Sequence, residues 1–197
     1  AFIGAFSPYF GLYLQSLSFS AWDIGLLMSQ MQLMRLFGPY IWGSLADRAA
    51  RRVPIVRLAA AASVVGFSAF FFASDFVALL VAMALMAFFW SAALPLVETI
   101  TFDHLRDESA KYSRIRVWGS VGFIFAVMAT GALLDFVPLP ALLWVCLGTL
   151  LGILLYAVAM PEAPVHCALG DPMPVGKVLR QRHVQALLAS CFAMSAA

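Results

Sequence analysis

Glu98 and Arg116 are two opposite charges that lie within long apolar stretches of the chain. A charged side chain inside a membrane helix costs about 2.5–3.5 kcal/mol on insertion scales, so such residues pair with one another or border a wet cavity. Asp107 lies nine residues from each of them, and a hairpin centred there brings the two charges level. The spacing therefore predicts that Glu98 and Arg116 form a mutual pair or border a wet cavity. The alternative is an interfacial salt bridge with Arg116 extended toward the membrane surface.

Arg35 is a further charge in an apolar stretch, and Gln32 precedes it by one helical turn on the same face. Arg35 lies halfway along its predicted helix, where a guanidinium reaches either surface with most difficulty. If Arg35 and Arg116 share a cavity, an anionic substrate is favoured, because a guanidinium binds a carboxylate through two hydrogen bonds. The alternative is that Arg35 pairs structurally with a carboxylate or helix end elsewhere in a longer chain. Phe6, Tyr9 and Tyr13 share one face and could line the cavity, although such stripes more often pack.

Glu98 is also the residue that we expect to couple solute binding to protons. Burial favours the neutral form of a carboxyl group, whereas a nearby guanidinium favours the ionised form. If the balance differs between two conformations, Glu98 takes up and releases a proton. The three histidines lack the spacing of metal ligands, and no phosphate-binding or nucleophile motif is present, so we expect no metal, cofactor or catalytic residue.

The composition places these residues in a membrane protein. Of the 197 residues, 63% are hydrophobic and 11% are charged, and the mean hydropathy is +0.94. Soluble domains carry roughly 25% charged residues, which excludes a cytosolic enzyme, a nucleic-acid-binding module and a disordered tail. The net charge of +2 gives no reason to expect a nucleic-acid partner.

Apolar runs of roughly 20 residues predict the membrane helices. They are a first helix ending at Ser16, then Ile24–Ala46, Val56–Ala73, Phe76–Phe102, Tyr112–Leu134, Ala141–Met160, and the start of a seventh at Val184. The chain begins without Met inside an apolar segment and ends inside another, so we expect a piece of a longer protein. The predicted domains are a six-helix half over 1–160 with a truncated first helix, a Pro-rich linker over 161–183, and the start of a seventh helix over 184–197.

The distribution of charge predicts the orientation of these helices. Eleven of the 12 basic residues follow the second, fourth and sixth helices, whereas Asp23, Asp75 and Asp135 follow the others. Basic loops face the cytoplasm, so we expect the linker to be cytoplasmic. Small residues also predict close helix packing. They are Gly119, Gly122 and Ala126 on the fifth helix and Gly148 and Gly152 on the sixth.

The loop after the second helix reads Gly-Ser-Leu-Ala-Asp-Arg-Ala-Ala-Arg-Arg from Gly43 to Arg52. Asp47 opposes the dipole at the end of its helix and so requires a partner from elsewhere, which the missing side chain of Gly43 would admit. The run resembles the signature between helices 2 and 3 of the major facilitator superfamily, with Ala50 in place of its second Gly. The resemblance implies a conformational latch between two halves of a transporter. Its residues would be Gly43, Asp47, Arg48, Arg51 and Arg52.

The run from Pro95 to Gly122 is similar to the branch of this superfamily that includes lactose permease and 3-phenylpropionate transporters, as is Phe-Gly-Leu-Tyr-Leu-Gln at 10–15. The resemblance implies an all-α integral membrane half-bundle of three plus three inverted repeats, with substrate near the midplane between two halves. It also implies that Glu98 and Arg116 bind substrate. Phe123 occupies the position of the Trp that stacks on a galactoside, and Phe stacks on a ring without offering an indole donor.

The residues and the resemblance together predict a secondary active transporter of a bacterial inner membrane. We expect proton-coupled symport of a small organic acid, such as an aromatic monocarboxylate, by a protein whose second six-helix half lies beyond this chain. The alternative within the same class is a sugar or nucleoside proton symporter. The alternative from another class is a membrane sensor or scaffold that transports nothing, in which Arg35, Glu98 and Arg116 have structural partners only.

Overall fold

The computed structural model describes residues 2–49, 51–73, 75–105 and 109–161, which are mostly helical, with no strand among them. The elements are α1 (Phe2–Ser16), α2 (Ala21–Ala49), α3 (Val53–Ser68), the short 3-10 helix η1 (Ala69–Phe71), α4 (Phe76–Leu105), α5 (Ser109–Leu134) and α6 (Ala141–Ala159). The six predicted helices are thus confirmed. The predicted linker and seventh helix lie outside the described residues.

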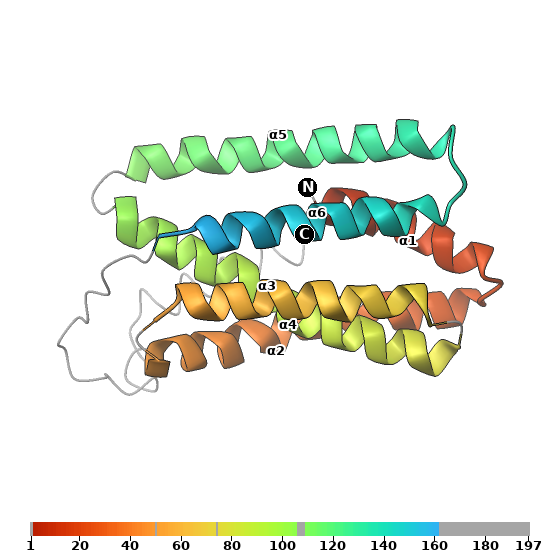
Figure 1. The fold of residues 1–197 in the computed structure, drawn as a ribbon, viewed down its shortest axis with the longest axis horizontal. Coiled ribbons are helices and arrows are strands. Elements are labelled where there is room, and N and C mark those ends of the chain that lie inside the picture. Colours follow the sequence, from red (N-terminus) through yellow and green to blue (C-terminus); the bar gives the residue numbers. More distant parts are fainter. Residues whose placement is uncertain (1, 50, 74, 106–108, 162–197) are drawn as a thin grey trace, which may run out of the picture. The chain divides into compact units, whose positions relative to one another are not determined.

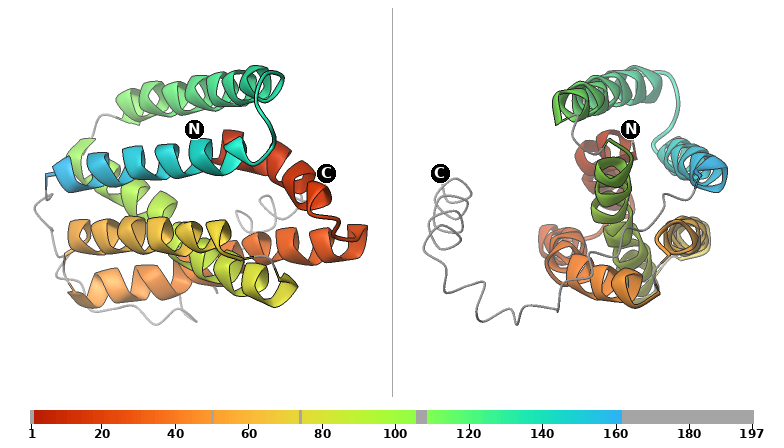
Figure 2. Two further views of the ribbon diagram at one scale, coloured as in Figure 1. Left: turned by 45° about the vertical axis from the view of Figure 1, so that its right-hand side comes forward. Right: turned by 90° about the vertical axis from the view of Figure 1, so that its left-hand side faces the viewer.

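The helices form one bundle around α1 and α4, seen end-on in the right-hand view of Figure 2. α4 packs against α2 on one side and α3 on the other, and it crosses the bundle obliquely (Figure 1). α1 packs against α5 and α6, and α6 also packs against α3. α5 has the smallest buried share of the apolar helices, so most of its surface faces away from the other described helices.

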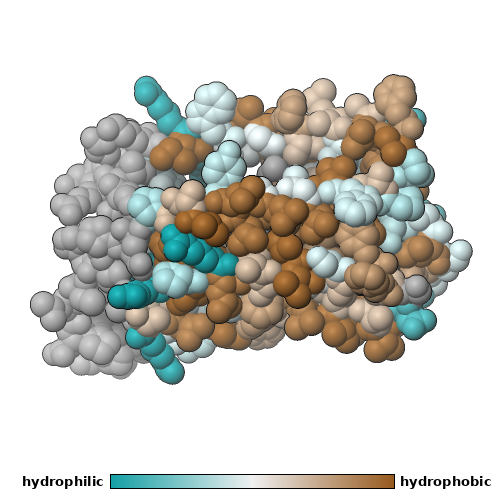
Figure 3. All heavy atoms as spheres, in the orientation of Figure 1, coloured by the Kyte–Doolittle hydropathy of each residue, from teal (hydrophilic) through white to brown (hydrophobic). Residues whose placement is uncertain are grey.

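Four helices in the described part are long and apolar enough to cross a membrane: Val53–Phe71, Phe76–Phe102, Tyr112–Leu134 and Ala141–Ala159. α2 has the length, but Gln30, Gln32 and Arg35 lower its hydropathy. The 15 residues of α1 extend about 22 Å at about 1.5 Å per residue. Figure 3 shows that hydrophobic residues cover most of one flank and that the strongly hydrophilic ones gather toward the helix ends.

Aromatic rings of α1 form the larger of two apolar cores. The Phe6 and Phe10 rings stack with centroids 4.2 Å apart, and Phe10 meets Phe70 of η1 edge-on. Phe6 and Tyr13 are buried in this core, and the Tyr9 hydroxyl donates to the Val127 carbonyl of α5 at 3.0 Å. These three aromatic residues of α1 therefore pack the bundle, and none of them lines the cavity described below.

Glycines allow helices to approach closely, but at positions other than those predicted. A Cβ on Gly4 would lie 3.2 Å from the Cβ of Ala126, and one on Gly66 would lie 3.1 Å from the Met86 nitrogen. A Cβ on Gly38 or Gly131 would collide with Ser91 or Tyr9, respectively. The prediction was right for Ala126. The described structure leaves open space around the other four small residues: Gly119, Gly122, Gly148 and Gly152.

Side chains also fix two helix ends. Ser20 and Asp23 bond reciprocally at the start of α2, where the Asp23 carboxylate accepts from the Ser20 amide and the Ser20 hydroxyl accepts from the Asp23 amide. At the end of α6, Arg57 of α3 donates to the carbonyls of Ala157 (3.1 Å) and Met160 (2.9 Å). Arg57 is therefore more than one charge of a basic loop, because it donates to carbonyls at the end of α6, where backbone donors become scarce.

Candidate functional site

The predicted pairing of Glu98 and Arg116 is confirmed. Nη1 of Arg116 lies 3.1 Å from Oε1 of Glu98, and this salt bridge joins α5 to α4. The Arg116 side chain is 67% exposed and that of Glu98 is 36% exposed. The pair is therefore accessible within the described bundle, and a guest that reaches Arg116 can compete with Glu98 for it.

Two aromatic residues that the sequence did not single out complete this cluster. The Tyr112 hydroxyl accepts a hydrogen bond of 3.1 Å from Nη1 of Arg116. The Tyr112 ring stacks on Phe102 of α4, with centroids 4.2 Å apart and planes 25° apart. The hairpin symmetry that pairs Glu98 with Arg116 also pairs Phe102 with Tyr112, each five residues from Asp107, so this signal was available in the sequence.

Glu98 and Arg35 line one cavity of about 450 Å³. Its lining comes from α1, α2, α4 and α6: Ile3, Arg35, Pro39, Trp90, Ser91, Ala93, Leu94, Pro95, Val97, Glu98 and Ile153. The two opposite charges thus share one largely apolar chamber. Arg116 does not line it and is joined to it through Glu98. Of the two arginines, only Arg35 therefore lines the cavity, and Arg116 contacts the Glu98 carboxylate from outside its lining.

Arg35 is exposed, and its Nη1 donates to Oε1 of Gln32 over a long 3.4 Å. The two residues share a helix face, as predicted. This contact is weak, since hydrogen bonds from nitrogen to oxygen are usually 2.7–3.2 Å long. Arg35 therefore has donors left for another partner within the cavity.

The interface between α2 and α4 sets the position of Arg35 relative to Glu98. Nε1 of buried Trp42 donates to the Phe88 carbonyl at 3.0 Å, and the Ser91 hydroxyl donates to the same carbonyl at 2.6 Å. Gly38, nearly one turn after Arg35, lies directly against Ser91. The cavity wall is therefore built on a fixed helix pair.

Phe123 lies two turns after Arg116 on α5 and outside this cavity. Its ring carbon Cδ2 lies 3.3 Å from where a Cβ on Gly4 would be, so the ring borders α1, and its side chain is exposed on the other side. The described structure does not bring Phe123 together with Arg35 and Glu98.

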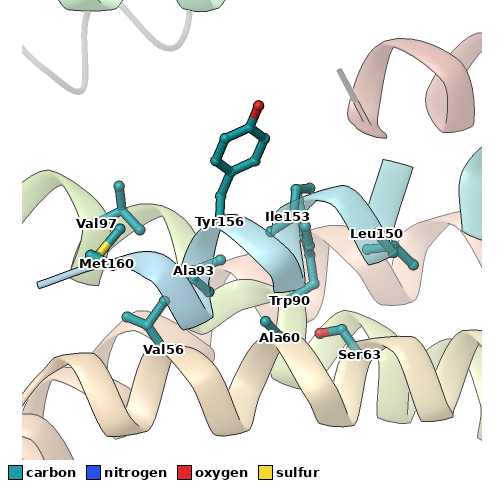
Figure 4. Close-up of a pocket in the computed structure, with 11 residues that line it drawn as sticks. Val56, Ala60, Ser63, Trp90, Ala93, Val97, Leu150, Ile153, Tyr156 and Met160 are labelled. Atoms are coloured by element: carbon teal, nitrogen blue, oxygen red, sulfur yellow. The ribbon is translucent and has the colours of Figure 1, made fainter. Parts of the chain in front are cut away.

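A second, almost wholly apolar cavity of about 210 Å³ adjoins the first between α3, α4 and α6 (Figure 4). Both cavities share the same wall of side chains: Trp90, Ala93, Val97 and Ile153. The Ser63 hydroxyl donates to its own helix at Ala59, and Tyr156 points away from the cavity in Figure 4. The cavity that Arg35 and Glu98 line is therefore adjoined by a second space with apolar walls.

The described part of the Gly43–Arg52 motif lies at the adjoining ends of α2 and α3. Gly43 has open space where a Cβ would be, and no partner comes close to it among the described residues. Arg48 and Arg51 are exposed, and Arg52 is the residue before α3. The side chain of Asp47, and Ala50, lie outside the described residues.

Comparison with known proteins decides the family. The model of the MFS_1 like family matches residues 1–196. The chain belongs to this family of major facilitator transporters. A maltose permease from Geobacillus stearothermophilus is 29% identical over 188 residues, which is 95% of this chain and 46% of the permease. A probable 3-phenylpropionic acid transporter from Escherichia coli K12 is 24% identical over 163 residues, 81% of this chain and 43% of that protein.

The fold agrees with this membership. The crystal structure of nucleoside transporter NupG (D323A mutant) superposes with a TM-score of 0.79 at 21% identity, covering 89% of this chain and 44% of NupG. The chain thus spans about half the length of the transporters it matches. The six helices are accordingly a major facilitator half-bundle.

Proposed function

We propose that the full protein is a secondary active transporter that couples proton entry to uptake of a small organic acid, such as an aromatic monocarboxylate. The observation that carries this proposal is the arrangement of Arg35, Glu98 and Arg116, in which one carboxylate lies in a chamber with one guanidinium and is paired with another. At this site the carboxylate of a substrate can replace the Glu98 carboxylate as the partner of Arg116.

The exchange supplies a coupling mechanism. A substrate carboxylate that binds Arg116 takes the place of Glu98, whose negative charge then has no cation partner at 3.1 Å. A carboxylate that loses its cation partner in an apolar chamber binds a proton more readily. Substrate and proton therefore enter together, and the returning Glu98–Arg116 pair expels both on the other side. Arg35, with donors to spare, orients the substrate from α2.

The cavity lining supports an apolar body on the substrate. Trp90, Leu94 and Ile153 form the walls beside the charges, and the adjoining chamber is apolar as well. A ring or alkyl chain is stabilised there by removal of its surface from water, at roughly 25 cal/mol per Å². Polar hydroxyls of a sugar would lose hydrogen bonds to water on the same wall.

A sugar or nucleoside symporter is the second candidate. It is favoured by the maltose permease and the nucleoside transporter, which are named for these substrates. A sensor or scaffold is the third, and it requires that no solute binds at Arg116. Gln32 and Phe123 belong to the proposal as flanking contacts to the substrate from α2 and α5.

We also propose that the protein lies in a bacterial inner membrane with its basic loops in the cytoplasm. The Gly43–Arg52 motif would form a conformational latch against the second half of the transporter. The open space at Gly43 supports the latch, because an element from that half can approach there.

Uptake by the full-length protein in proteoliposomes tests the proposal. With a pH gradient, acidic outside, we expect labelled 3-phenylpropionate to accumulate and a protonophore to abolish the accumulation. Accumulation of maltose or uridine instead would establish the second candidate. A protein that neither binds nor moves any of the three would favour the sensor or scaffold.

A further inference from the structure

Tyr112 lies one helical turn before Arg116 on α5 and shares a nitrogen of Arg116 with Glu98. Nη1 of Arg116 is 3.1 Å from the Tyr112 hydroxyl oxygen and 3.1 Å from Oε1 of Glu98. The guanidinium is thus held from two directions, by a carboxylate of the neighbouring helix and by a phenol of its own.

Tyr112 is itself fixed by α4. Its ring stacks on Phe102, which lies one turn after Glu98 on that helix. The four residues form two layers of the α4–α5 hairpin, with the ion pair in one layer and the ring pair in the next. The hydroxyl of Tyr112 joins the layers, so that the stacked ring pair helps to set where the Arg116 side chain lies.

Such support matters because the Arg116 side chain is mostly exposed. A free arginine side chain carries substantial rotamer entropy, which a ligand must overcome when it fixes the guanidinium. A guanidinium that is already oriented binds a carboxylate more tightly, since less ordering accompanies binding.

We infer that Tyr112 is a positioning residue that orients the Arg116 guanidinium for the substrate carboxylate. Its hydroxyl still accepts a hydrogen bond from Arg116 when the Glu98 salt bridge is broken. The inference rests on the proposed function for its consequence, but its physical content concerns Arg116 alone.

The first test measures Arg116 without substrate. In the full-length protein in nanodiscs, labelled with 15N-arginine, the Nε–Hε signal of Arg116 is assigned by its loss in Arg116→Lys. Tyr112→Phe keeps the stack on Phe102 and removes only the hydroxyl, and Tyr40→Phe is the matched control, because Tyr40 is an exposed residue of α2. We expect a lower order parameter for Arg116 in Tyr112→Phe and no change in Tyr40→Phe. An unchanged order parameter in Tyr112→Phe would overturn the inference, whatever the substrate is.

The second test measures binding of 3-phenylpropionate to the same proteins. We expect Tyr112→Phe to raise Kd by about three- to tenfold, the range for loss of one such bond, while the thermal unfolding midpoint stays unchanged. An unchanged Kd would contradict the positioning role. If the wild-type protein does not bind 3-phenylpropionate at all, the proposed substrate class fails, while the order parameter of Arg116 still decides whether Tyr112 positions it.

Discussion

The indole Nε1 of Trp42 donates to the carbonyl oxygen of Phe88 at 3.0 Å, and this bond fixes α2 on α4 within the bundle. The Ser91 hydroxyl, which donates to the same carbonyl, packs on Gly38. α2 carries Arg35 and α4 carries Glu98, so this interface determines how far apart the two charges of the cavity lie.

Gly38→Ala tests that interface. The new Cβ would lie 2.6 Å from the Cβ of Ser91, a contact that no rotamer of Ser91 relieves. We expect a loss of about 1–3 kcal/mol in the free energy of unfolding, the usual cost of overpacking. Gly25→Ala is the matched control, because Gly25 lies on the same helix with open space around it in the described structure. Equal unfolding midpoints for the two variants would contradict the close approach of α2 and α4.

Much of this site could be predicted from the sequence, for a physical reason that also explains what was missed. Glu98 and Arg116 are related by a short hairpin, so their separation along the chain fixes their pairing in space. Trp42 and Phe88 meet across two helices whose mutual rotation depends on the whole bundle.

The same reason accounts for the glycines and for Phe123. Gly148 and Gly152 have the spacing of a packing motif, but the described structure leaves open space at both, whereas Gly38 and Gly131 meet side chains that lie far away in sequence. Phe123 is expected to contact substrate from its place in a motif, and in the described structure its ring borders α1 and does not line the cavity of Arg35 and Glu98.

Gly131 and Tyr9 provide a second test, at the contact between α1 and α5. A Cβ on Gly131 would collide with the Tyr9 hydroxyl, which donates to the Val127 carbonyl. We expect Gly131→Ala to destabilise the protein by about 1–3 kcal/mol. In a Tyr9→Phe background the obstructing oxygen is gone, and the same change should cost much less. A double-mutant cycle of unfolding free energies checks this, and strictly additive effects would show that the two residues do not meet.

Arg57→Gln tests the end of α6. The substitution removes the hydrogen bonds to the Ala157 and Met160 carbonyls. We expect a loss of about 1 kcal/mol, because an exposed bond to a helix end is worth little. Arg114→Gln, at an exposed arginine of α5, serves as the control of equal charge change. If both variants unfold at the same temperature as the wild type, Arg57 does not hold the end of α6.

Glu98→Gln separates proton coupling from substrate movement. The amide cannot exchange a proton, so accumulation of 3-phenylpropionate against its gradient should be lost, while exchange of labelled for unlabelled substrate continues. In the wild type, accumulation should fall as external pH rises toward internal pH, and in the variant it should not respond to the gradient. Asp135→Asn, a change in the α5–α6 connection, should behave as the wild type does. Intact pH-driven accumulation in Glu98→Gln would remove Glu98 from the coupling mechanism.

In the proposed mechanism, the chamber that holds Arg35 and Glu98 contains water and admits a carboxylate. Leu94 lines that chamber and is largely exposed, so Leu94→Cys in a cysteine-free full-length protein reports on it directly. We predict that N-ethylmaleimide labels this cysteine readily and that saturating 3-phenylpropionate slows labelling several-fold, with no effect on Phe136→Cys in the α5–α6 connection. A cysteine at position 94 that does not react, or that reacts equally fast with and without the acid, would contradict the account.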